Sequence, residues 1–387
     1  MSMLTEEQID KLRKEGRIPF YKNIFPPNIE GFYDGELANL VGEANRSIGN
    51  LNSGARIVPN PDLVVGPMLL REALASSEIE GTISTARDVA EEDVGLMSPR
   101  GGRSNAAEVR NHMEATRLGI SLLDSGVPII TRSIKSMHET LLTGVRGQEH
   151  RPGNFREWSN VVAPPDVKES GELEKIIYIP PKATEISQLM SNFDTFLNSE
   201  SPNLDLLLKC SLIHYEFEAI HPFLDGNGRI GRVLISLYLI QEGVLEYPLL
   251  YMSGFLLRNK DEYYRLLLRV TTKEDWPAWF KFFLIGVKEQ AQRSRKILES
   301  IRDLYEKHRK LAKVNIKSGH VEEFVKLYFT SPVVTANIVK GRLGVQHATA
   351  MNLLQKATEL GLLSKNDRKK RSVPFYNHSL ISLLDQA

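Results

Sequence analysis

Residues 221–232 read HPFLDGNGRIGR and connect a helical pattern that ends near Ala219 to another that runs to Gln241. Gly226 and Gly228 permit positive φ angles and carry no side chain, so the backbone N–H groups around them can turn toward a ligand. The N-terminus of a helix also attracts anions through its dipole and its unpaired amides. This stretch therefore predicts an anion-binding loop that leads directly into a helix.

The side chains of this loop extend the prediction to a polyphosphate. Arg229 and Arg232 are three residues apart, so they share one helix face and can both contact phosphate oxygens. Asp225 places a carboxylate beside the loop, as expected if a divalent cation bridges it to phosphates. His221 supplies a base whose ordinary pKa is near neutral. Together these residues predict a polyphosphate cradle with a metal ligand and a base.

Two other interpretations of the same stretch stay open at this point. The GxGxxG spacing that begins at Gly226 fits a dinucleotide-binding fingerprint, but that fingerprint needs a preceding strand and here a helix is predicted. A zinc site could use His214, Glu218 and His221, although neither an HExxH pattern nor a cysteine set is present. The phosphate cradle accounts for more residues of the stretch than either alternative does.

The periodicity of the first 310 residues predicts a mainly α protein. Helices are expected over residues 35–51, 67–80, 105–125, 133–142, 184–197, 201–219, 229–241, 261–270 and 276–311. Ser201 is the expected cap of the helix that ends near Ala219. Residues 144–182 are rich in glycine and proline, and short extended pieces at 160–162 and 176–181 predict a hairpin or an ordered loop there.

Residues 320–387 have the pattern of a separate unit. The expected elements are helices over 321–329, 336–343 and 346–360, a turn at Gly344, and a hairpin from 362–364 and 373–376. Thr335 is the expected cap of the short second helix. This order is typical of a winged helix-turn-helix. The hairpin tip, residues 365–371, carries five positive charges against one negative charge.

A winged helix makes a DNA-binding regulator the alternative function. Polar residues that its third helix could present to bases are Gln346, His347, Thr349, Asn352 and Gln355. A protein-interaction or dimer-stabilising module is the competing interpretation of this unit, because fold does not fix function.

Composition limits the remaining functional classes. The 387 residues include 49 Lys+Arg and 48 Asp+Glu, so no global charge excess marks nucleic acid or a membrane as the main partner. The single cysteine, Cys210, cannot form an internal disulfide, which favours a reducing compartment. The acidic N-terminus is unlike a signal peptide, and the most apolar run, residues 233–240, is too short to span a bilayer. We expect two or three domains and a cytoplasmic protein with no membrane partner.

Residues 221–232 resemble the complete signature of the Fic family, His-x-Phe-x-Asp/Glu-Gly-Asn-Gly-Arg-x-x-Arg, with no departure. Ser76, Glu80 and Gly81 resemble the family's inhibitory-helix motif, Ser/Thr-x-x-x-Glu-Gly/Asn. The stretch from Phe25 to Pro27 resembles the start of the family's N-terminal domain. Residues 153–156 and 178–181 resemble the flap that borders the target site. The chain is identified on these motifs as a member of the Fic family over about residues 20–285.

The resemblance implies three domains. They are an N-terminal Fic-associated helical domain over 1–104 with an inhibitory helix over 67–81, a Fic catalytic core over 105–300 with a small β-hairpin flap, and a linker helix with a winged helix-turn-helix over 301–387. It implies a protein adenylyltransferase that moves AMP from ATP to a Tyr, Ser or Thr hydroxyl of a protein target, which could be the chain itself. A Fic enzyme acting mainly to remove AMP is the alternative within this class. The target and the oligomeric state, including a homodimer, are left open.

The resemblance also implies a role for each residue of the loop. His221 is the general base, Asp225 binds Mg²⁺, and Phe223 points into the core and holds the loop. The phosphate-binding residues are Gly226, Asn227 and Gly228 for the α- and β-phosphates, Arg229 for the β-phosphate and Arg232 for the γ-phosphate. Such transfers depend more on positioning and charge neutralisation than on covalent catalysis.

The inhibitory motif implies a second role for Arg232. By resemblance, Glu80 pairs with Arg232 and denies ATP the contact intended for its γ-phosphate, while Ser76 belongs to the same inhibitory helix. The expected result is an enzyme that is silenced until this pair opens.

Overall fold

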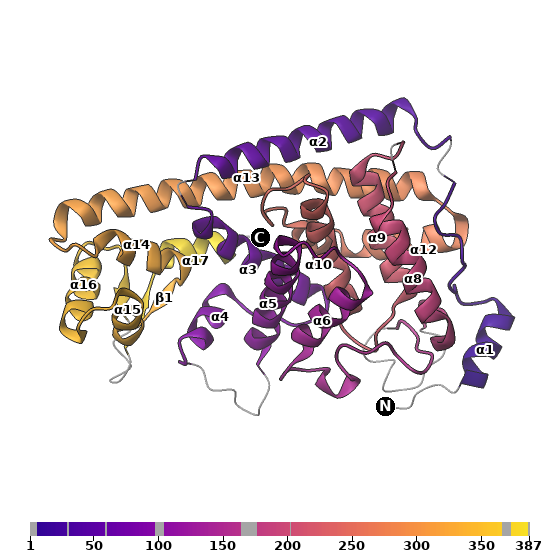
Figure 1. The fold of residues 1–387 in the computed structure, drawn as a ribbon, viewed down its shortest axis with the longest axis horizontal. Coiled ribbons are helices and arrows are strands. Elements are labelled where there is room, and N and C mark those ends of the chain that lie inside the picture. Colours follow the sequence, from indigo (N-terminus) through magenta and orange to yellow (C-terminus); the bar gives the residue numbers. More distant parts are fainter. Residues whose placement is uncertain are drawn as a thin grey trace. The chain divides into compact units, whose positions relative to one another are not determined.

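The helical periodicity of the sequence is realised as a mainly α fold (Figure 1). The computed structural model describes residues 6–28, 31–58, 60–96, 104–163, 176–201, 203–365 and 373–385. The chain divides into two compact units. Unit 1 comprises Met1–Ile48, Glu114–Glu246 and Phe255–Glu289, and unit 2 comprises Gly49–Met113, Tyr247–Gly254 and Gln290–Ala387. The predicted division into three domains stays a prediction.

Each unit has its own set of elements, and four helices contribute residues to both. Unit 1 contains α1 (Glu6–Glu15), α6 (Thr131–Leu142), η1 (Gln148–His150), η3 (Ala183–Glu185), α8 (Ile186–Asn198), α9 (Leu206–Ile220), α10 (Asn227–Gln241) and α12 (Lys260–Lys273). The shared helices are α2 (Gly35–Arg56), α5 (Asn105–Asp124), α11 (Met252–Arg258) and α13 (Trp276–Asn315). Unit 2 contains α3 (Asp62–Ile79), α4 (Ala86–Asp93), α14 (Val321–Thr330), β1 (Val333–Val334), α15 (Ala336–Leu343), α16 (His347–Glu359), β2 (Ser364–Lys365), β3 (Phe375–Tyr376) and α17 (His378–Asp385).

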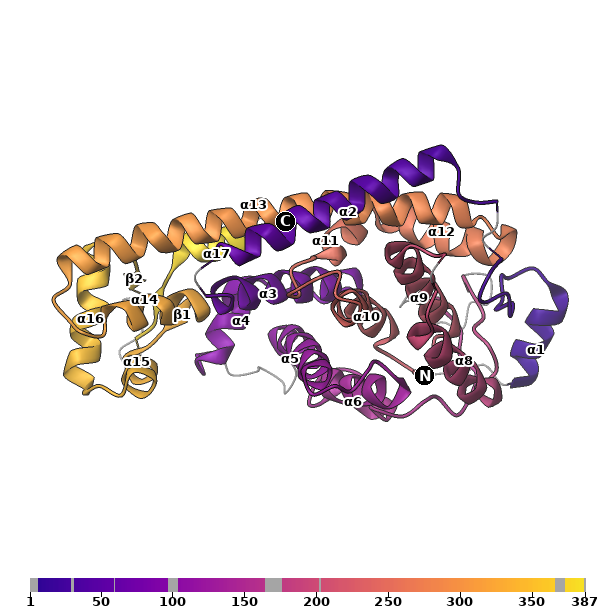
Figure 2. The same cartoon turned by 45° about the horizontal axis from the view of Figure 1, so that its top comes forward.

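Helix α9 is the centre of unit 1. Nearly all of its residues are buried, because a helix that is apolar on every side needs protein on every side. Its main partner is α10, and the two helices lie side by side in both views (Figures 1 and 2). The indole of Trp279 donates a hydrogen bond to the carbonyl of Ser211 at 3.1 Å. Trp276 packs edge-to-face on Tyr215 with ring centroids 4.8 Å apart. The first turns of α13 thus close the core around α9.

The prediction that Ser201 caps α9 is wrong. The helix begins at Leu206, and the carboxylate of Asp205 accepts the N–H of Leu207 at 2.8 Å. The carbonyl of Ser201 instead accepts the N–H of Leu204 at 3.0 Å, so the chain makes a separate turn before the helix starts. An aspartate is an equally good cap, and the apolar pattern alone did not distinguish the turn from the first helical turn.

The two extended pieces predicted in the flap region pair with each other. Val162 and Tyr178 form an antiparallel bridge, with the Val162 N–H donating to the Tyr178 carbonyl at 2.9 Å. Residues 164–175, which would connect them, lie outside the described residues. Ile179 also pairs in parallel with Phe20, and Ile9 of α1 packs against Ile179. The sequence did not predict this N-terminal addition to the flap.

In unit 2, helix α3 begins earlier than the inhibitory helix predicted over 67–81. It starts at Asp62, whose N–H donates to the Asn60 side chain at 3.0 Å, so Pro67 lies inside the helix. Glu80 is the C-cap, and Gly81 follows with a φ of 86°, which confirms the predicted stop at this glycine.

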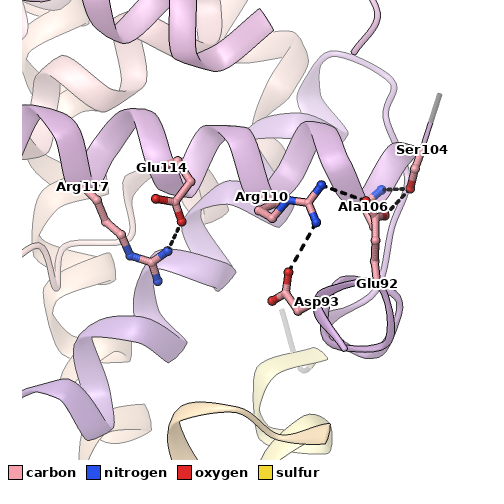
Figure 3. A network of polar contacts seen from close by, with 7 residues as sticks. All are labelled: Glu92, Asp93, Ser104, Ala106, Arg110, Glu114 and Arg117. Carbon is pink, nitrogen blue, oxygen red and sulfur yellow. Dashed lines mark hydrogen bonds and ion pairs between the residues drawn. The ribbon is translucent and has the colours of Figure 1, made fainter. Parts of the chain in front are cut away.

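Helix α4, which was not predicted, is bound to α5 by a polar network that Figure 3 shows from close by. Arg110 contacts Glu92 at 2.9 Å and Asp93 at 3.6 Å. Ser104 donates a hydrogen bond to the second carboxylate oxygen of Glu92 at 2.5 Å. Further along α5, Arg117 pairs with Glu114. These contacts hold the end of α4 against the start of α5.

The C-terminal elements of unit 2 occur in the predicted order. Strand β3 pairs antiparallel with β1 and β2, which gives the sheet order β1-β3-β2. Thr335 caps α15 as predicted, with the Ile338 N–H donating to its hydroxyl at 3.4 Å, and Gly344 makes the turn with a φ of 64°. Most of the basic hairpin tip, residues 366–371, lies outside the described residues. The assignment to the winged helix-turn-helix class stays a prediction.

Among the described residues, the sequence did not predict the four α-helices α1, α4, α11 and α17. All are short, so each offers few turns in which an apolar period can repeat. Helix α17 is fixed by a buried arginine of α3, because Arg71 donates to the carbonyls of Leu383 and Leu384 at 2.7 and 3.0 Å. In the part of the chain that the structure describes, no helix is both long and apolar enough to cross a membrane.

Candidate active site

The loop that carries the sequence motif begins where α9 ends, at His221. This residue is the C-cap of α9 and has a left-handed φ of 50°, a conformation that glycine usually adopts at the end of a helix. Its N–H donates to the Phe217 carbonyl at 3.1 Å. The ring Nδ1 lies 3.3 Å from the Glu218 carbonyl. A carbonyl can only accept, so Nδ1 carries the proton and Nε2 is the nitrogen that can act as a base.

A buried arginine outside the motif holds the end of α9. Arg156 donates from Nε to the His221 carbonyl at 2.9 Å and from Nη2 to the Ile220 carbonyl at 3.5 Å. The same Nη2 donates to the Pro181 carbonyl in the flap region at 2.7 Å. The backbone N–H of Arg156 donates to the Pro222 carbonyl at 3.0 Å. The carbonyls of Ile220 and His221 lie at the end of α9, where carbonyls lack partners within the helix, and the cation satisfies them at the negative end of the helix dipole.

Asn227 closes the loop with its side chain. Its Oδ1 accepts the N–H of Phe223 at 2.8 Å, and its Nδ2 donates to the Phe223 carbonyl at 2.9 Å. The Phe223 ring is fully buried, which confirms that it points into the core. The amide of Asn227 is therefore used to shape the loop, and a contact from this residue to a phosphate would have to come from its backbone N–H.

Asp225 presents an ionised carboxylate at the loop. Its Oδ1 accepts the Gly226 N–H at 2.7 Å and lies 3.5 Å from Nη2 of Arg229. Burial raises the pKa of this carboxyl, but the charge of Arg229 and the Gly226 hydrogen bond, with smaller effects from Arg146 and His150, bring the pKa below its ordinary value. An anionic oxygen donor at this point is the type of ligand that Mg²⁺ prefers.

The loop ends in the N-terminus of α10. Gly226 is the N-cap with a φ of 78°, and as a glycine it has no side chain that could cap this end. Gly228 follows in the first turn and is partly exposed, whereas Arg229 and Arg232 are 1% and 2% exposed. Both guanidinium groups are therefore buried, which excludes a free surface arginine at either position.

His138 of α6 connects this loop to the segment that precedes the flap. Its Nδ1 accepts the Gly153 N–H at 2.9 Å, so Nε2 must carry the proton that it donates to the Asp225 carbonyl at 2.8 Å. The ring stacks on Phe223 with centroids 3.7 Å apart and planes 7° apart. Burial lowers the pKa of His138 to about 4, although the bond to Asp225 opposes this, so the ring is neutral at pH 7.

The zinc site considered from the sequence is wrong for the described residues. His214 is buried, with Nδ1 3.0 Å from the Gly231 carbonyl and Nε2 2.9 Å from the Tyr263 hydroxyl, so both ring nitrogens have protein partners. Nowhere in the described ranges do three His, Cys, Asp or Glu side chains form a group that could hold a metal. The dinucleotide-binding interpretation is also wrong, because helix α9 stands where that fold requires a strand.

The predicted inhibitory residues lie in unit 2. Ser76 is buried in the last turns of α3, and Glu80 is the partly exposed C-cap of the same helix. Cys210 is fully buried in α9 of unit 1, and burial raises the pKa of its thiol, as expected for a packing residue. Unit 1 therefore brings together all the predicted base, metal and phosphate-binding residues, and unit 2 holds the predicted inhibitory residues.

Comparison with known families agrees with this geometry. The Fic/DOC family model matches residues 128–239, which include the whole loop, and the Fic/DOC family N-terminal model matches residues 38–121. The chain belongs to the Fic/DOC family. The mainly helical, Fic-type fold predicted from the sequence is thereby confirmed.

Curated Fic proteins resemble only part of the chain. The protein adenylyltransferase Fic of Drosophila grimshawi is 35% identical over 91 residues, which are 23% of this chain and 18% of that protein. The protein of the same name from Drosophila melanogaster is 36% identical over 91 residues, or 23% of this chain and 17% of that protein. The match thus spans less than a fifth of these relatives.

Solved structures of Fic proteins share the fold over more of the chain. A Fic family protein from Desulfovibrio desulfuricans superposes with a TM-score of 0.57 at 21% identity, covering 89% of this chain and 96% of that one. A Fic domain containing signaling protein from Bacteroides thetaiotaomicron superposes with a TM-score of 0.50 at 17% identity, covering 68% and 97% of the two chains. At these identities the likeness shows the fold.

Sequence reasoning missed the residues that hold the Fic loop from outside. Arg156 was noted only within a flap-like stretch, and His138 and Gly147 were not singled out. A β-carbon on Gly147, whose φ is 90°, would lie 2.5 Å from Oδ2 of Asp225. A signal for such residues is weak in one sequence, because their contacts join positions tens of residues apart.

Proposed function

We propose that this Fic protein is a protein adenylyltransferase that transfers AMP from ATP to a Tyr, Ser or Thr hydroxyl of a protein target. The observation that carries the proposal is the intact loop, which presents a base at the end of α9 and an anionic metal ligand beside the N-terminus of α10. The adenylyltransferase name of the curated relatives supports the same activity.

The N-terminus of α10 would bind the phosphates of ATP. In this proposal Gly226, Asn227 and Gly228 line the site of the α- and β-phosphates, with Arg229 at the β-phosphate and Arg232 at the γ-phosphate. The donors are the backbone N–H groups of Asn227 and Gly228, because the N–H of Gly226 donates to Oδ1 of Asp225. A helix N-terminus favours an anion, and here the N-cap is a glycine without a side chain. Buried guanidinium groups interact strongly with phosphate because little water screens them.

The carboxylate of Asp225 fits a Mg²⁺ ion. It is an oxygen donor that is held ionised by its neighbours, and its side chain is 32% exposed, so an ion can reach it. When bound, Mg²⁺ supplies positive charge to the α- and β-phosphates. The protein's own contribution is to keep Oδ1 engaged with Gly226, which leaves Oδ2 as the oxygen for the ion.

The proposed step is a displacement at the α-phosphorus. Nε2 of His221 takes the proton of the target hydroxyl, and the hydroxyl oxygen forms a bond to the α-phosphorus. The bond from that phosphorus to the oxygen bridging to the β-phosphate breaks, and pyrophosphate leaves. General-base catalysis of this type contributes about 10²- to 10⁴-fold.

Glu80 is the proposed inhibitory residue, with Ser76 in the same helix. Its carboxylate would compete with the γ-phosphate for Arg232, so ATP would bind with its α-phosphate turned from the line of attack. The position of Glu80 at the C-cap, where a side chain can leave the helix, supports this assignment.

The test uses the full chain and its Glu80→Gly variant with Mg²⁺ and ATP labelled either at the α- or at the γ-phosphate. We expect the variant to label itself or lysate proteins from α-labelled ATP only, at least about tenfold faster than the wild type, which is about 1.4 kcal/mol of barrier. Label from γ-labelled ATP would indicate phosphate transfer and contradict the proposal. Equal rates for the two chains would remove the inhibitory assignment alone.

DNA binding is a second candidate function of the C-terminal elements. The five residues predicted to face bases are all exposed on α16 or at its N-cap: Gln346, His347, Thr349, Asn352 and Gln355. We expect a mobility shift of duplex DNA by the full chain that weakens steeply with salt. Absence of a shift at about 50 mM salt, where electrostatic attachment is strong, would contradict this candidate.

A further inference from the structure

The motif loop is held at both ends by buried side chains that the motif does not contain. At the end of α9, Arg156 donates to the carbonyls of Ile220 and His221. At the start of α10, His138 donates to the carbonyl of Asp225. Arg156 and His138 are 3% and 0% exposed, so little water competes for these bonds.

We call the contacts of Arg156 the first clamp of the loop and the contact of His138 the second clamp. The left-handed backbone of His221 explains why the first clamp is needed. A non-glycine residue in this conformation is strained and persists only when its surroundings fix it. The guanidinium of Arg156 supplies this constraint through the carbonyls of His221 and Ile220. The backbone N–H of the same residue donates to the next carbonyl, that of Pro222. The direction of the His221 ring therefore depends on the guanidinium of Arg156.

The second clamp acts on the metal-ligand end of the loop through one peptide group. The trans peptide between Asp225 and Gly226 is planar, so its C=O and N–H point in opposite directions. His138 fixes the carbonyl on one side, and the N–H on the other side donates to Oδ1 of Asp225 at 2.7 Å. The orientation of this carboxylate therefore depends on Nε2–H of His138.

We propose that Arg156 and His138 are positioning residues with separable effects: Arg156 orients the base, and His138 orients the metal ligand and the phosphate-binding amides. The inference rests on the proposed adenylyltransferase function. Loss of the first clamp should slow transfer at saturating ATP without weakening nucleotide binding. Loss of the second should weaken the binding of ATP with Mg²⁺.

The experiment compares three variants in the Glu80→Gly chain. Arg156→Lys keeps a cation but loses the fork that reaches several carbonyls at once. His138→Asn keeps an oxygen that can accept the Gly153 N–H in place of Nδ1, but it loses the donor to the Asp225 carbonyl. His138→Gln keeps an amide N–H at the position of Nε2, so it can still donate to that carbonyl. Affinity for Mg²⁺ and ATP is measured by calorimetry, transfer by the initial rate of α-label incorporation, and folding by circular dichroism.

We expect Arg156→Lys to lower the saturated rate by about 10²-fold, the effect of a misplacement of about 1 Å, with ATP affinity within about threefold. We expect His138→Asn to weaken ATP affinity at least about tenfold, as loss of a residue supporting a metal ligand commonly does, and His138→Gln to restore it to within about threefold. Changes of rate and affinity together in every variant, or equal effects of His138→Asn and His138→Gln, would overturn the inference. Failure of the Glu80→Gly parent to transfer label would instead reject the proposed function, and the affinity measurements would still decide the role of His138.

Discussion

Replacing Gly147 by alanine should displace the carboxylate of Asp225 and weaken the Mg²⁺-dependent binding of ATP. A β-carbon at this position would lie 2.5 Å from Oδ2 and 3.3 Å from Cγ of Asp225. Ordinary contacts between such atoms are about 3.5 Å, so one of the two groups must move by about 1 Å. A shift of that size in a reacting site costs on the order of 10²-fold in rate.

Gly144→Ala is the matched control for this variant. Gly144 lies three residues earlier, between α6 and η1, with a φ of 73°, but a β-carbon there would meet nothing within 4 Å among the described residues. Both substitutions place alanine at a positive φ and should each lower the free energy of unfolding by about 1–2 kcal/mol. Only Gly147→Ala adds the contact with Asp225, so the difference between the variants isolates the carboxylate.

The assay is calorimetric binding of ATP to each variant with and without Mg²⁺. We expect Gly147→Ala to bind ATP at least about tenfold more weakly than Gly144→Ala when Mg²⁺ is present, with little difference when it is absent. Equal Mg²⁺-dependent affinities for the two variants would refute the claim that Asp225 is the metal ligand.

The remaining predictions concern one loop side chain, which makes two hydrogen bonds, and one buried acid. Asn227→Ala leaves the N–H and C=O of Phe223 buried without their partner. The free energy of unfolding, measured by urea titration, should therefore fall by about 2–5 kcal/mol. Unchanged stability with lost ATP binding would show instead that the side chain contacts phosphate. Burial raises the pKa of Glu216 to about 8, against a weaker opposite effect of the hydrogen bond from Tyr21. The folded chain therefore holds a proton that the unfolded chain loses, so the free energy of unfolding should fall as the pH rises from 5 to 8, by up to about 1.4 kcal/mol per pH unit. Glu216→Gln should flatten this slope. An unchanged slope in the variant would contradict the raised pKa of Glu216.

The central helices and the motif loop could be predicted because their signals are local. Glycines and a dense apolar pattern within the span from α9 to α10 determine a helix, a loop and a second helix without reference to distant residues. The same holds for Thr335 and Gly344, whose roles as cap and turn depend on their nearest neighbours.

The residues that complete the site could not be predicted, because their function comes from contacts across the fold. Arg156 meets His221 over 65 positions, and His138 meets Asp225 over 87. The left-handed conformation of His221 also has no sequence signal, since glycine is the residue expected at such a helix end. The short helices α1 and α17 were missed for a related reason: they are stabilised by packing more than by their own periodicity.

The most direct test of the proposed chemistry is the rate of α-label incorporation from ATP in the Glu80→Gly chain with and without His221→Ala, measured together with ATP affinity. The base acts on the incoming hydroxyl and not on the nucleotide. We therefore predict a loss of at least about 10²-fold in the rate, with ATP affinity within about threefold. A double variant that keeps more than about a tenth of the parent's rate would contradict the role of His221 as the base and, with it, the proposed mechanism.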